Sequence, residues 1–319
     1  MMTAAGDIEA QLAGHVPIER DAALDTWYRV GGRADLLARP ETAEQLARCV
    51  EVGTTQDQVL IIGDGANLLV ADAGVGGLVV SLQQGDFVRT RIDAKTGRVR
   101  VGAGAALPRL INTCVAQGLA GIEGISGIPA TVGGALRMNA GGSFGAIADV
   151  VRTVTVIDRD GAERTLARDE VGFGYRTSDL AGRIVTEVEL ELAPSDPVAL
   201  KARLKDVMAY KTGSQPMSAR SAGCAFRNPT LAEDLQIDGE RIGDAGERVS
   251  AGLLIDRAGC KGHRVGGAFV SDRHANFIAT EGDASAGDVI AVMDGVAARV
   301  LDRFGVVLER EVVVWERDR

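Results

Sequence analysis

The sequence predicts an α+β fold with two or three compact domains. Strand-like and helix-like patterns both run along the chain, but they do not alternate one for one as a doubly wound sheet requires. No internal repeat is visible. With 319 residues, of which 46% are hydrophobic and 25% are charged, the chain is long enough and apolar enough for more than one core.

Four segments have apolar residues at helical spacing. The first three are residues 41–53, residues 106–118, and a segment after residue 197 with apolar positions at Leu200, Leu204, Val207 and Met208. The fourth is residues 285–304. Gly53 and Gly305 follow the first and last of these segments, as glycine often does at the end of a helix.

Other segments read as strands, because they are short, rich in branched apolar residues and bounded by glycine or polar turns. They are residues 58–70 (interrupted by a glycine turn), 77–82, 98–104, 150–161 (a strand followed by a turn signal), 184–192 and 306–315. Alternation in residues 184–192 predicts that Glu187, Glu189 and Glu191 face solvent. APSDP (193–197) is the best candidate for a linker.

The charge balance argues against polyanionic partners. The net charge is −9 and only five residues are lysine, so we expect neither a nucleic-acid partner nor a membrane partner. The N-terminal residues lack a basic start followed by an apolar run, and no apolar span reaches 18 residues. Four widely spaced cysteines without a CxxC pair are typical of reduced thiols, so we expect a cytoplasmic protein.

Three glycine turns lie in the first half of the chain: GDGAN (63–67), VGAG (101–104) and the long stretch 121–145. GDGAN is not a dinucleotide-binding GxGxxG motif, because its sixth residue is Leu68, and GK[ST] is absent from the sequence. Backbone amides in such turns bind pyrophosphate without lysine, so the three together favour an elongated phosphate-bearing ligand. The alternative is three tight loops in a compact domain.

Seven motifs occur in a recognisable order. They are WYRVGGRAD (27–35), GDGANLLVAD (63–72), GISGIPATVGGALRMNAGG (124–142), FGYR (173–176), SAGCAFRNP (221–229), GGAFVSDRHANFI (266–278) and LEREV (308–312). The set resembles the UDP-N-acetylenolpyruvoylglucosamine reductase family from about Trp27 to Trp315. Only 38 residues separate Arg176 from Gln215, which resembles the shorter subclass without a substrate-capping insertion.

The resemblance implies a two-subdomain FAD-binding domain of the vanillyl-alcohol-oxidase type and a smaller C-terminal α/β substrate-binding domain. The expected boundaries are 1–80 and 81–200 for the FAD subdomains, 201–305 for the substrate domain, and 306–319 for a strand returning to the flavin site. FAD and NADPH are the implied cofactors. The implied FAD-binding residues are Val30, Gly31, Gly63, Asp64, Gly65, Ala66, Asn67, Gly127, Ile128, Pro129, Gly133, Gly134, Asn139, Gly141 and Gly145.

The implied activity is reduction of the enolpyruvyl group of UDP-N-acetylglucosamine enolpyruvate to the lactyl ether, in the synthesis of peptidoglycan precursors. Hydride goes to C3, and C2 then needs charge stabilisation and a proton. Arg176 is a permanent cation suited to the carboxylate and the developing enolate. Cys224 stands where the family commonly has a proton-donating serine, and a thiol is the stronger acid. The acidic partner is Glu311 by family alignment, whereas spacing alone leaves Glu309 open.

The implied substrate contacts are Tyr175, Lys211, Arg227, Asn228 and Asn276. His274 in RHANFI is expected to help shape the site. The three histidines have no carboxylate at ligand spacing, so we expect no metal site. We expect a monomer or a weak dimer.

The sequence departs from the family pattern at Asp64, Ala66 and Ala130, where the family usually has glycine, serine and glycine. These departures favour one alternative, a non-catalytic protein that binds flavin or a sugar nucleotide. Another FAD oxidoreductase on the same scaffold is the second alternative, but it would have no reason to keep SAGCAFRNP and the terminal glutamate.

Overall fold

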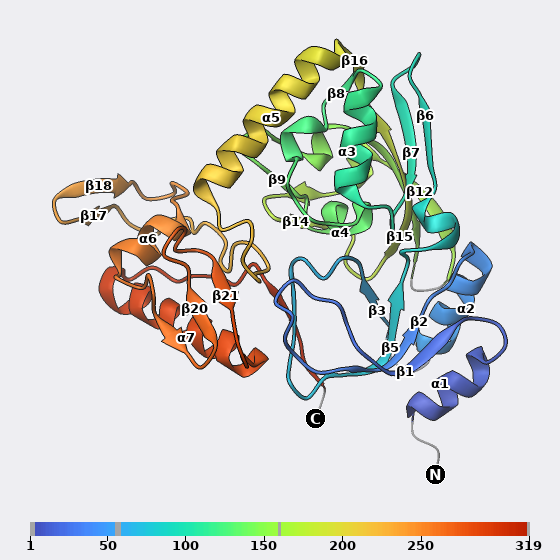
Figure 1. Ribbon diagram of the computed structural model, residues 1–319, viewed down its shortest axis with the longest axis horizontal. Helices are drawn as coiled ribbons and strands as arrows, with labels where there is room; N and C mark the ends of the chain where they lie inside the picture. The colour runs from blue at the N-terminus through green and yellow to red at the C-terminus, as the bar shows by residue number, and fades with distance from the viewer. Residues whose placement is uncertain (1–3, 55–58, 159–160, 318–319) are drawn as a thin grey trace. The chain divides into compact units, whose positions relative to one another are not determined.

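The computed structural model describes residues 4–54, 59–158 and 161–317 and is mixed α and β (Figure 1). Its α-helices are α1 (Ala4–Leu12), α2 (Ala43–Thr54), α3 (Leu107–Ala116), α4 (Val132–Arg137), α5 (Pro197–Ser214), α6 (Ala251–Arg257) and α7 (Ala286–Phe304). Its short 3-10 helices are η1 (Gly85–Val88), η2 (Glu123–Ile125), η3 (Ile147–Asp149) and η4 (Arg168–Glu170). None of the helices in these ranges is both long and apolar enough to cross a bilayer.

The strands of the first two-thirds are β1 (Ile18–Ala22), β2 (Ala34–Ala38), β3 (Val59–Ile62), β4 (Leu68–Val70), β5 (Val75–Ser81), β6 (Thr90–Asp93), β7 (Arg98–Gly102), β8 (Leu119–Ala120), β9 (Gly141–Gly142), β10 (Gly145–Ala146), β11 (Val151–Ile157), β12 (Glu163–Ala167), β13 (Phe173–Gly174), β14 (Thr177–Ser178), β15 (Ile184–Glu191) and β16 (Ala193–Pro194). The later strands are β17 (Leu235–Ile237), β18 (Glu240–Gly243), β19 (Arg264–Val265), β20 (Ala268–Val270), β21 (Ile278–Thr280) and β22 (Val313–Trp315).

The described residues form two compact units. The first is drawn from Met1–Ala23, Ala34–Asp64 and Gly76–Lys211, and the second from Leu24–Arg33, Gly65–Val75 and Thr212–Arg319. The chain therefore leaves the first unit twice before residue 76, so that two short early segments belong with the C-terminal third.

The first unit contains two sheets. The smaller has the strand order β1-β2-β5-β3, in which β1 and β2 are antiparallel and β3 and β5 are parallel. The larger is antiparallel, with the order β12-β11-β15-β7-β6. One continuous core joins them, and it includes Leu46 on α2, Ile111 on α3, Val80 on β5, Val99 on β7 and Val154 on β11.

The second unit has its own core. Strands β19, β20 and β21 form an antiparallel sheet beside α7, whose Val289, Val292, Met293, Val296 and Val300 are all buried (Figure 1). Helix α7 begins at the N-cap Ser285 and ends at the left-handed Gly305, as the sequence predicts. Strand β22 pairs in parallel with β4, so the last strand of the chain joins a segment that follows GDGAN directly.

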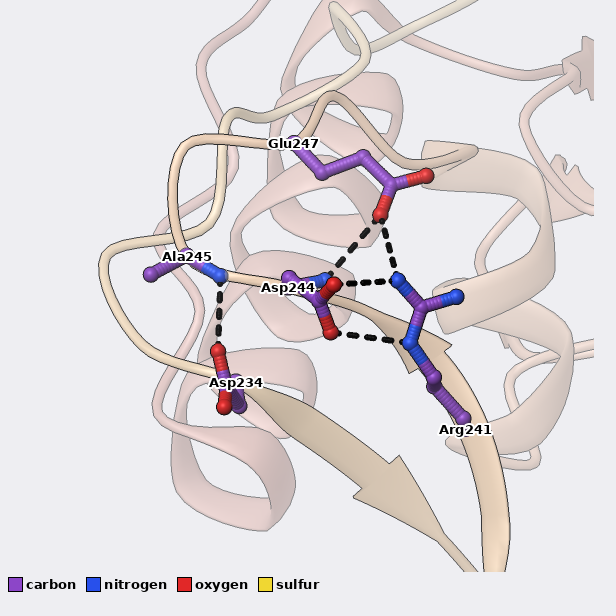
Figure 2. Close-up of polar contacts among 5 residues, drawn as sticks. All are labelled: Asp234, Arg241, Asp244, Ala245 and Glu247. Carbon is purple, nitrogen blue, oxygen red and sulfur yellow. Dashed lines mark hydrogen bonds and ion pairs between the residues drawn. The ribbon is translucent and has the colours of Figure 1, made fainter.

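The β17–β18 hairpin of the second unit is fastened at its base by a polar cluster (Figure 2). Arg241 donates to both carboxylate oxygens of Asp244, at 2.8 and 2.5 Å, and its second nitrogen also contacts Glu247. Glu247 and Asp234 accept the backbone amides of Asp244 and Ala245. These side chains are exposed, so we interpret the cluster as a local brace of the turn at residues 244–247.

The predicted helices and most predicted strands are confirmed, with two corrections. Glu189 does not face solvent: it is 8% exposed and pairs with Arg100 (2.8 Å) and Arg152 (3.2 Å), because β15 is a central strand of its sheet. Only Val313–Trp315 of the predicted strand 306–315 forms a regular strand. A bridge between Phe226 and Arg310 pairs part of the remainder.

Candidate functional site

In the first unit the three glycine turns meet around the start of α4. A Cβ atom on Gly63 would overlap the hydroxyl oxygen of Thr131, and one on Gly133 would lie 3.0 Å from the Cβ of Ala103. Thr131 caps α4 by accepting the amide of Gly134 at 3.2 Å. Gly63 and Gly133 are therefore glycines because backbone and cap pack closely here, and parts of the three glycine turns lie together at this point.

Two other glycines in this region have no such explanation within the chain. A Cβ on Gly134 would meet only the Thr131 hydroxyl, at 3.3 Å, and one on Gly142 would meet nothing within 4 Å among the described residues. Side-chain-free backbone that faces open space next to packed glycine turns fits a large flat ligand with phosphates. The residues present thus fit FAD.

Asp64 is turned toward its own unit. Its carboxylate accepts a hydrogen bond from the Gln83 amide at 2.7 Å, and burial raises the pKa of the Asp64 carboxyl, with the Gln83 bond opposing that shift. The side chain therefore has a partner within the chain, which reduces the electrostatic conflict expected for an aspartate beside a pyrophosphate.

The C-terminal end of α5 covers the start of the long glycine stretch. The ammonium of Lys211 donates to the Ser126 carbonyl at 2.5 Å, and a Cβ on Gly127 would lie 2.9 Å from the sulfur of Met208. Burial, and then the positive charge of Arg176, lowers the pKa of Lys211 to about 8. Two cations thus gather beside these glycines in a chain whose net charge is −9.

Tyr175 and Arg176 form the turn between β13 and β14. Arg176 adopts a left-handed backbone with φ +55°, which is unusual for a residue other than glycine. Its guanidinium donates to the Gly141 carbonyl at 2.7 Å and lies 5.7 Å from the centre of the Tyr175 ring. Asn139 donates from its side chain to the Gly174 carbonyl at 2.9 Å.

The early glycines of the second unit are required by the chain itself. Gly31 and Gly65 have positive φ values. A Cβ on Gly31 would overlap the backbone oxygen of Val70, and one on Gly65 would overlap that of Asp25. Asn67 donates from its side chain to the Glu311 carbonyl at 3.0 Å. GDGAN therefore holds the last strand as well as supplying a turn.

In the second unit Cys224 begins an extended segment held on both sides. On one side Ala225 donates to the backbone of Asn276 (2.7 Å), while the Asn276 side chain exchanges bonds of 2.9 and 2.8 Å with the backbone of Phe226. On the other side the backbone amide of Glu311 donates to the Ala225 carbonyl at 2.8 Å. Cys224 and Glu311 thus lie on adjacent segments, one residue apart in register.

Cys224 is half-buried, whereas the other three cysteines are buried. Tyr28 lies near Cys224. Burial raises the pKa of the Tyr28 hydroxyl far above its ordinary range, and the charge of the nearby Cys224 adds to this shift. That hydroxyl is fully buried and approaches the Ala222 amide without reaching hydrogen-bond geometry with any described residue.

Glu309 and Glu311 occupy different environments. Glu309 is 74% exposed and pairs with Arg227 at 3.9 Å, whereas Glu311 is half-buried. Asn228 accepts the amide of Ala251 at 3.0 Å, at the start of α6. Asn276 is only 2% exposed, and its amide oxygen and nitrogen both bond to the Phe226 backbone, so its side chain serves the packing of this unit.

The sequence-predicted site residues are divided between the two units. Arg176, Tyr175 and Lys211 belong to the first, with Gly63, Asp64, Asn139 and the predicted residues from Gly127 to Gly145. Cys224, Glu311, Arg227, Asn228 and Asn276 belong to the second, with the remaining predicted FAD-binding residues, Val30, Gly31, Gly65, Ala66 and Asn67.

Sequence reasoning missed three residues that shape the first unit's site. Thr131 stands directly before Val132 and Gly133, a helix-start pattern inside a motif that was otherwise recognised. Gln83 and Met208 gave no signal, because each meets its partner through a contact between segments far apart in the sequence.

Comparison with known proteins agrees with this layout. Residues 34–167 match the family model for an FAD binding domain, and residues 215–315 match that for the UDP-N-acetylenolpyruvoylglucosamine reductase C-terminal domain. The UDP-N-acetylenolpyruvoylglucosamine reductase 2 of Symbiobacterium thermophilum is 42% identical over 91% of this chain and 89% of its own. That of Moorella thermoacetica is 39% identical over 98% and 97%.

Among solved structures, the crystal structure of UDP-N-acetylenolpyruvylglucosamine reductase from Thermus caldophilus superposes with a TM-score of 0.76 at 40% identity. It covers 94% of this chain and 99% of its own. With identity near 40% over almost the whole length, the chain belongs to the UDP-N-acetylenolpyruvoylglucosamine reductase family.

Proposed function

We propose that this protein reduces the enolpyruvyl group of UDP-N-acetylglucosamine enolpyruvate to the lactyl ether, giving UDP-N-acetylmuramate for peptidoglycan synthesis. The observation that carries the proposal is the arrangement around Cys224. A half-buried thiol stands on a segment fixed by Asn276 on one side and bonded to the strand of Glu311 on the other.

FAD is held, in this proposal, by the glycine turns of the first unit, with Gly134 and Gly142 left open for its ring and phosphates. When bound and reduced by NADPH, FAD would supply the hydride needed at C3 of the enolpyruvyl group. Thr131, Gly63 and Gly133 fix the turns, and Gln83 holds the Asp64 carboxylate within the unit.

Cys224 is the proposed proton donor. Its S–H bond breaks as the C2–H bond of the product forms, and the resulting thiolate takes its next proton from water. A cysteine has an ordinary pKa of about 8.5, so it is mostly protonated at neutral pH and still a much stronger acid than serine. Glu311 is the proposed acid that hydrogen-bonds to the developing enolate, and its half-buried setting supports it over exposed Glu309.

Arg176 is proposed to bind the substrate carboxylate and offset the negative charge that develops at the enolate. Its planar, permanently charged guanidinium is suited to a carboxylate. Lys211 and Arg227 are proposed to bind the diphosphate, with Tyr175 and Asn228 completing the sugar-nucleotide site, while Asn276 fixes the segment that carries Cys224. The two cations gathered near Gly127 support an anionic ligand there.

The test is anaerobic stopped-flow absorbance of the flavin in purified holoenzyme. NADPH should bleach the flavin, and UDP-N-acetylglucosamine enolpyruvate should then reoxidise it. Cys224→Ala should leave the first step unchanged and slow the second by about 10²–10⁴, the usual contribution of a general acid. Cys224→Ser is the matched control and should retain more of the rate, since serine keeps a donor hydrogen.

Other outcomes identify the alternatives. A flavoprotein that NADPH reduces but the sugar never reoxidises would be another FAD oxidoreductase. A chain that cannot take up FAD would be a non-catalytic relative. We infer a cytoplasmic location from the use of NADPH. Three other expectations stay predictions: the monomeric or weakly dimeric state, the shorter subclass and the domain boundaries.

A further inference from the structure

The turn that carries Arg176 is tied to the segment 137–141 by a set of hydrogen bonds. Arg176 donates to Gly141 at 2.7 Å, and Asn139 donates to Gly174 at 2.9 Å. The Arg137 guanidinium donates to the Ser178 carbonyl at 3.1 Å, and the Ser178 hydroxyl donates to the Arg137 carbonyl at 3.0 Å. Both ends of the β13–β14 hairpin are therefore fixed to one short stretch of chain.

Two residues in this arrangement have left-handed backbones without being glycine. Asn139 has φ +41° and Arg176 has φ +55°. Such a conformation is unfavourable for an arginine, and it persists only where surrounding contacts hold it. The hydrogen bonds from residues 137–141 are contacts of that kind, so a weaker attachment should let the Arg176 turn relax.

The amide of Asn139 is used on both sides. Its nitrogen donates to the carbonyl of Gly174, and its oxygen accepts the backbone amide of Ala148 at 3.3 Å. The side chain therefore bridges η3 (Ile147–Asp149), the short helix that follows the β9–β10 hairpin, to Gly174, the residue that precedes the Tyr175–Arg176 turn.

We propose that Asn139 is a positioning residue, whose side chain fixes the Arg176 turn so that the guanidinium is held against Gly141 in the orientation that the reaction needs. The inference rests on the proposed role of Arg176 in binding the substrate carboxylate. It assigns the Asn139 side chain to the protein's own backbone, whereas the sequence resemblance implied contact with FAD.

Asn139→Asp is the sharpest test, because it keeps the oxygen that accepts from Ala148 and replaces only the donor to Gly174. A carboxylate facing the Gly174 carbonyl also repels it. We expect reoxidation of reduced flavin by UDP-N-acetylglucosamine enolpyruvate to slow by about tenfold or more, since small misplacements of a positioned group cost that much. FAD content and the rate of reduction by NADPH should stay within about twofold of the wild type.

Two further variants serve as a substitute for Asn139→Asp and as a control. Asn139→Gly accepts a positive φ and should show the same slow step if Asn139→Asp does not fold. Gln84→Glu is the matched control: it also exchanges an amide donor to a backbone carbonyl, that of Arg39, for a carboxylate, and Gln84 has no part in the proposed site. It should leave both half-reactions unchanged.

A double-mutant cycle decides whether Asn139 acts through Arg176. In an Arg176→Ala background, Asn139→Asp should slow reoxidation by less than about twofold further, because the group that it positions is gone. An effect as large as in the wild-type background would overturn the proposal. So would a loss of FAD content with a normal rate of reoxidation, which would make Asn139 an FAD contact.

Failure of the proposed function is distinguishable, because the wild-type enzyme would then not be reoxidised by the sugar. In that case the guanidinium NMR resonances of Arg176, identified by their loss in Arg176→Lys, test by themselves whether Asn139 positions this side chain. Asn139→Asp should broaden or shift them while Gln84→Glu leaves them in place. Unchanged resonances in Asn139→Asp would contradict positioning.

Discussion

The ammonium of Lys211, at the end of α5, donates a hydrogen bond to the carbonyl of Ser126 at 2.5 Å. Ser126 directly precedes Gly127, so this bond fastens a lysine of α5 to the glycine-rich stretch within the first unit. Burial comes first and Arg176 second in lowering the pKa of Lys211 to about 8. This places the loss of its charge within an accessible pH range.

We predict that binding of UDP weakens as pH rises through about 8, since Lys211 then becomes neutral. Lys211→Arg should bind UDP without this loss, because arginine stays charged at every accessible pH. The measurement is calorimetric titration of oxidised holoenzyme with UDP. A Cys224→Ser background excludes the titration of the thiol, and an equal loss of affinity in Lys211→Arg would contradict the prediction.

The same shift has a consequence for folding. The unfolded chain keeps the Lys211 proton up to an ordinary pKa of about 10.4, whereas the folded protein releases it near 8. Between these values the unfolded state binds more protons, so the free energy of unfolding gains a contribution that rises with pH. Urea titrations should show a smaller rise in Lys211→Met than in the wild type.

Replacement of Gly134 by alanine should separate folding from FAD binding. Gly134 is exposed in α4, so alanine should stabilise the FAD-free protein by up to about 0.5–1 kcal/mol through helix propensity. The new methyl group should weaken FAD binding if the open space above Gly134 receives FAD. Thermal unfolding and FAD titration give the two signs; Gly213→Ala in α5, whose added Cβ would meet nothing within 4 Å among the described residues, controls for helix propensity alone.

Substitutions of Glu309 and Glu311 should differ sharply in their effect on the reoxidation of reduced flavin. We expect Glu311→Gln to slow the reoxidation of reduced flavin by about 10²–10³, the usual scale for weakening one donor to a developing oxyanion. Glu309→Gln should change that rate by less than about threefold, because an exposed pair such as Glu309–Arg227 contributes little. Single-turnover kinetics on both variants check this, and a reversed order would make Glu309 the acid.

Asn276→Ala should act mainly on stability. It leaves the buried amide and carbonyl of Phe226 without their side-chain partner, and each such loss costs about 1–3 kcal/mol. We expect the urea midpoint to fall accordingly, and Asn228→Ala, whose bond with the Ala251 amide is only partly buried, to lower it less. Weakened UDP binding at unchanged stability in Asn276→Ala would instead indicate direct contact with substrate.

Much of the candidate site could be predicted from local pattern. The glycines that need positive φ, such as Gly31 and Gly65, and the capped helix that begins at Ser285 follow from constraints that act within a few residues. The mixed α and β class followed from how strand and helix patterns succeed one another. Glu189 was mispredicted because alternation does not reveal whether a strand is central in its sheet.

Residue type and order alone identify the family, the glycine turns proposed to bind FAD and the candidate residues Arg176, Cys224 and Glu311. How the amide side chains are used depends on the fold: Asn67 holds the strand after Glu311, Asn276 bonds to Phe226, and Asn139 braces the Arg176 turn. Each of these bonds joins residues at least 35 positions apart. An amide side chain suits a ligand or a backbone equally well, and only the neighbour that the fold brings to it settles which one it meets.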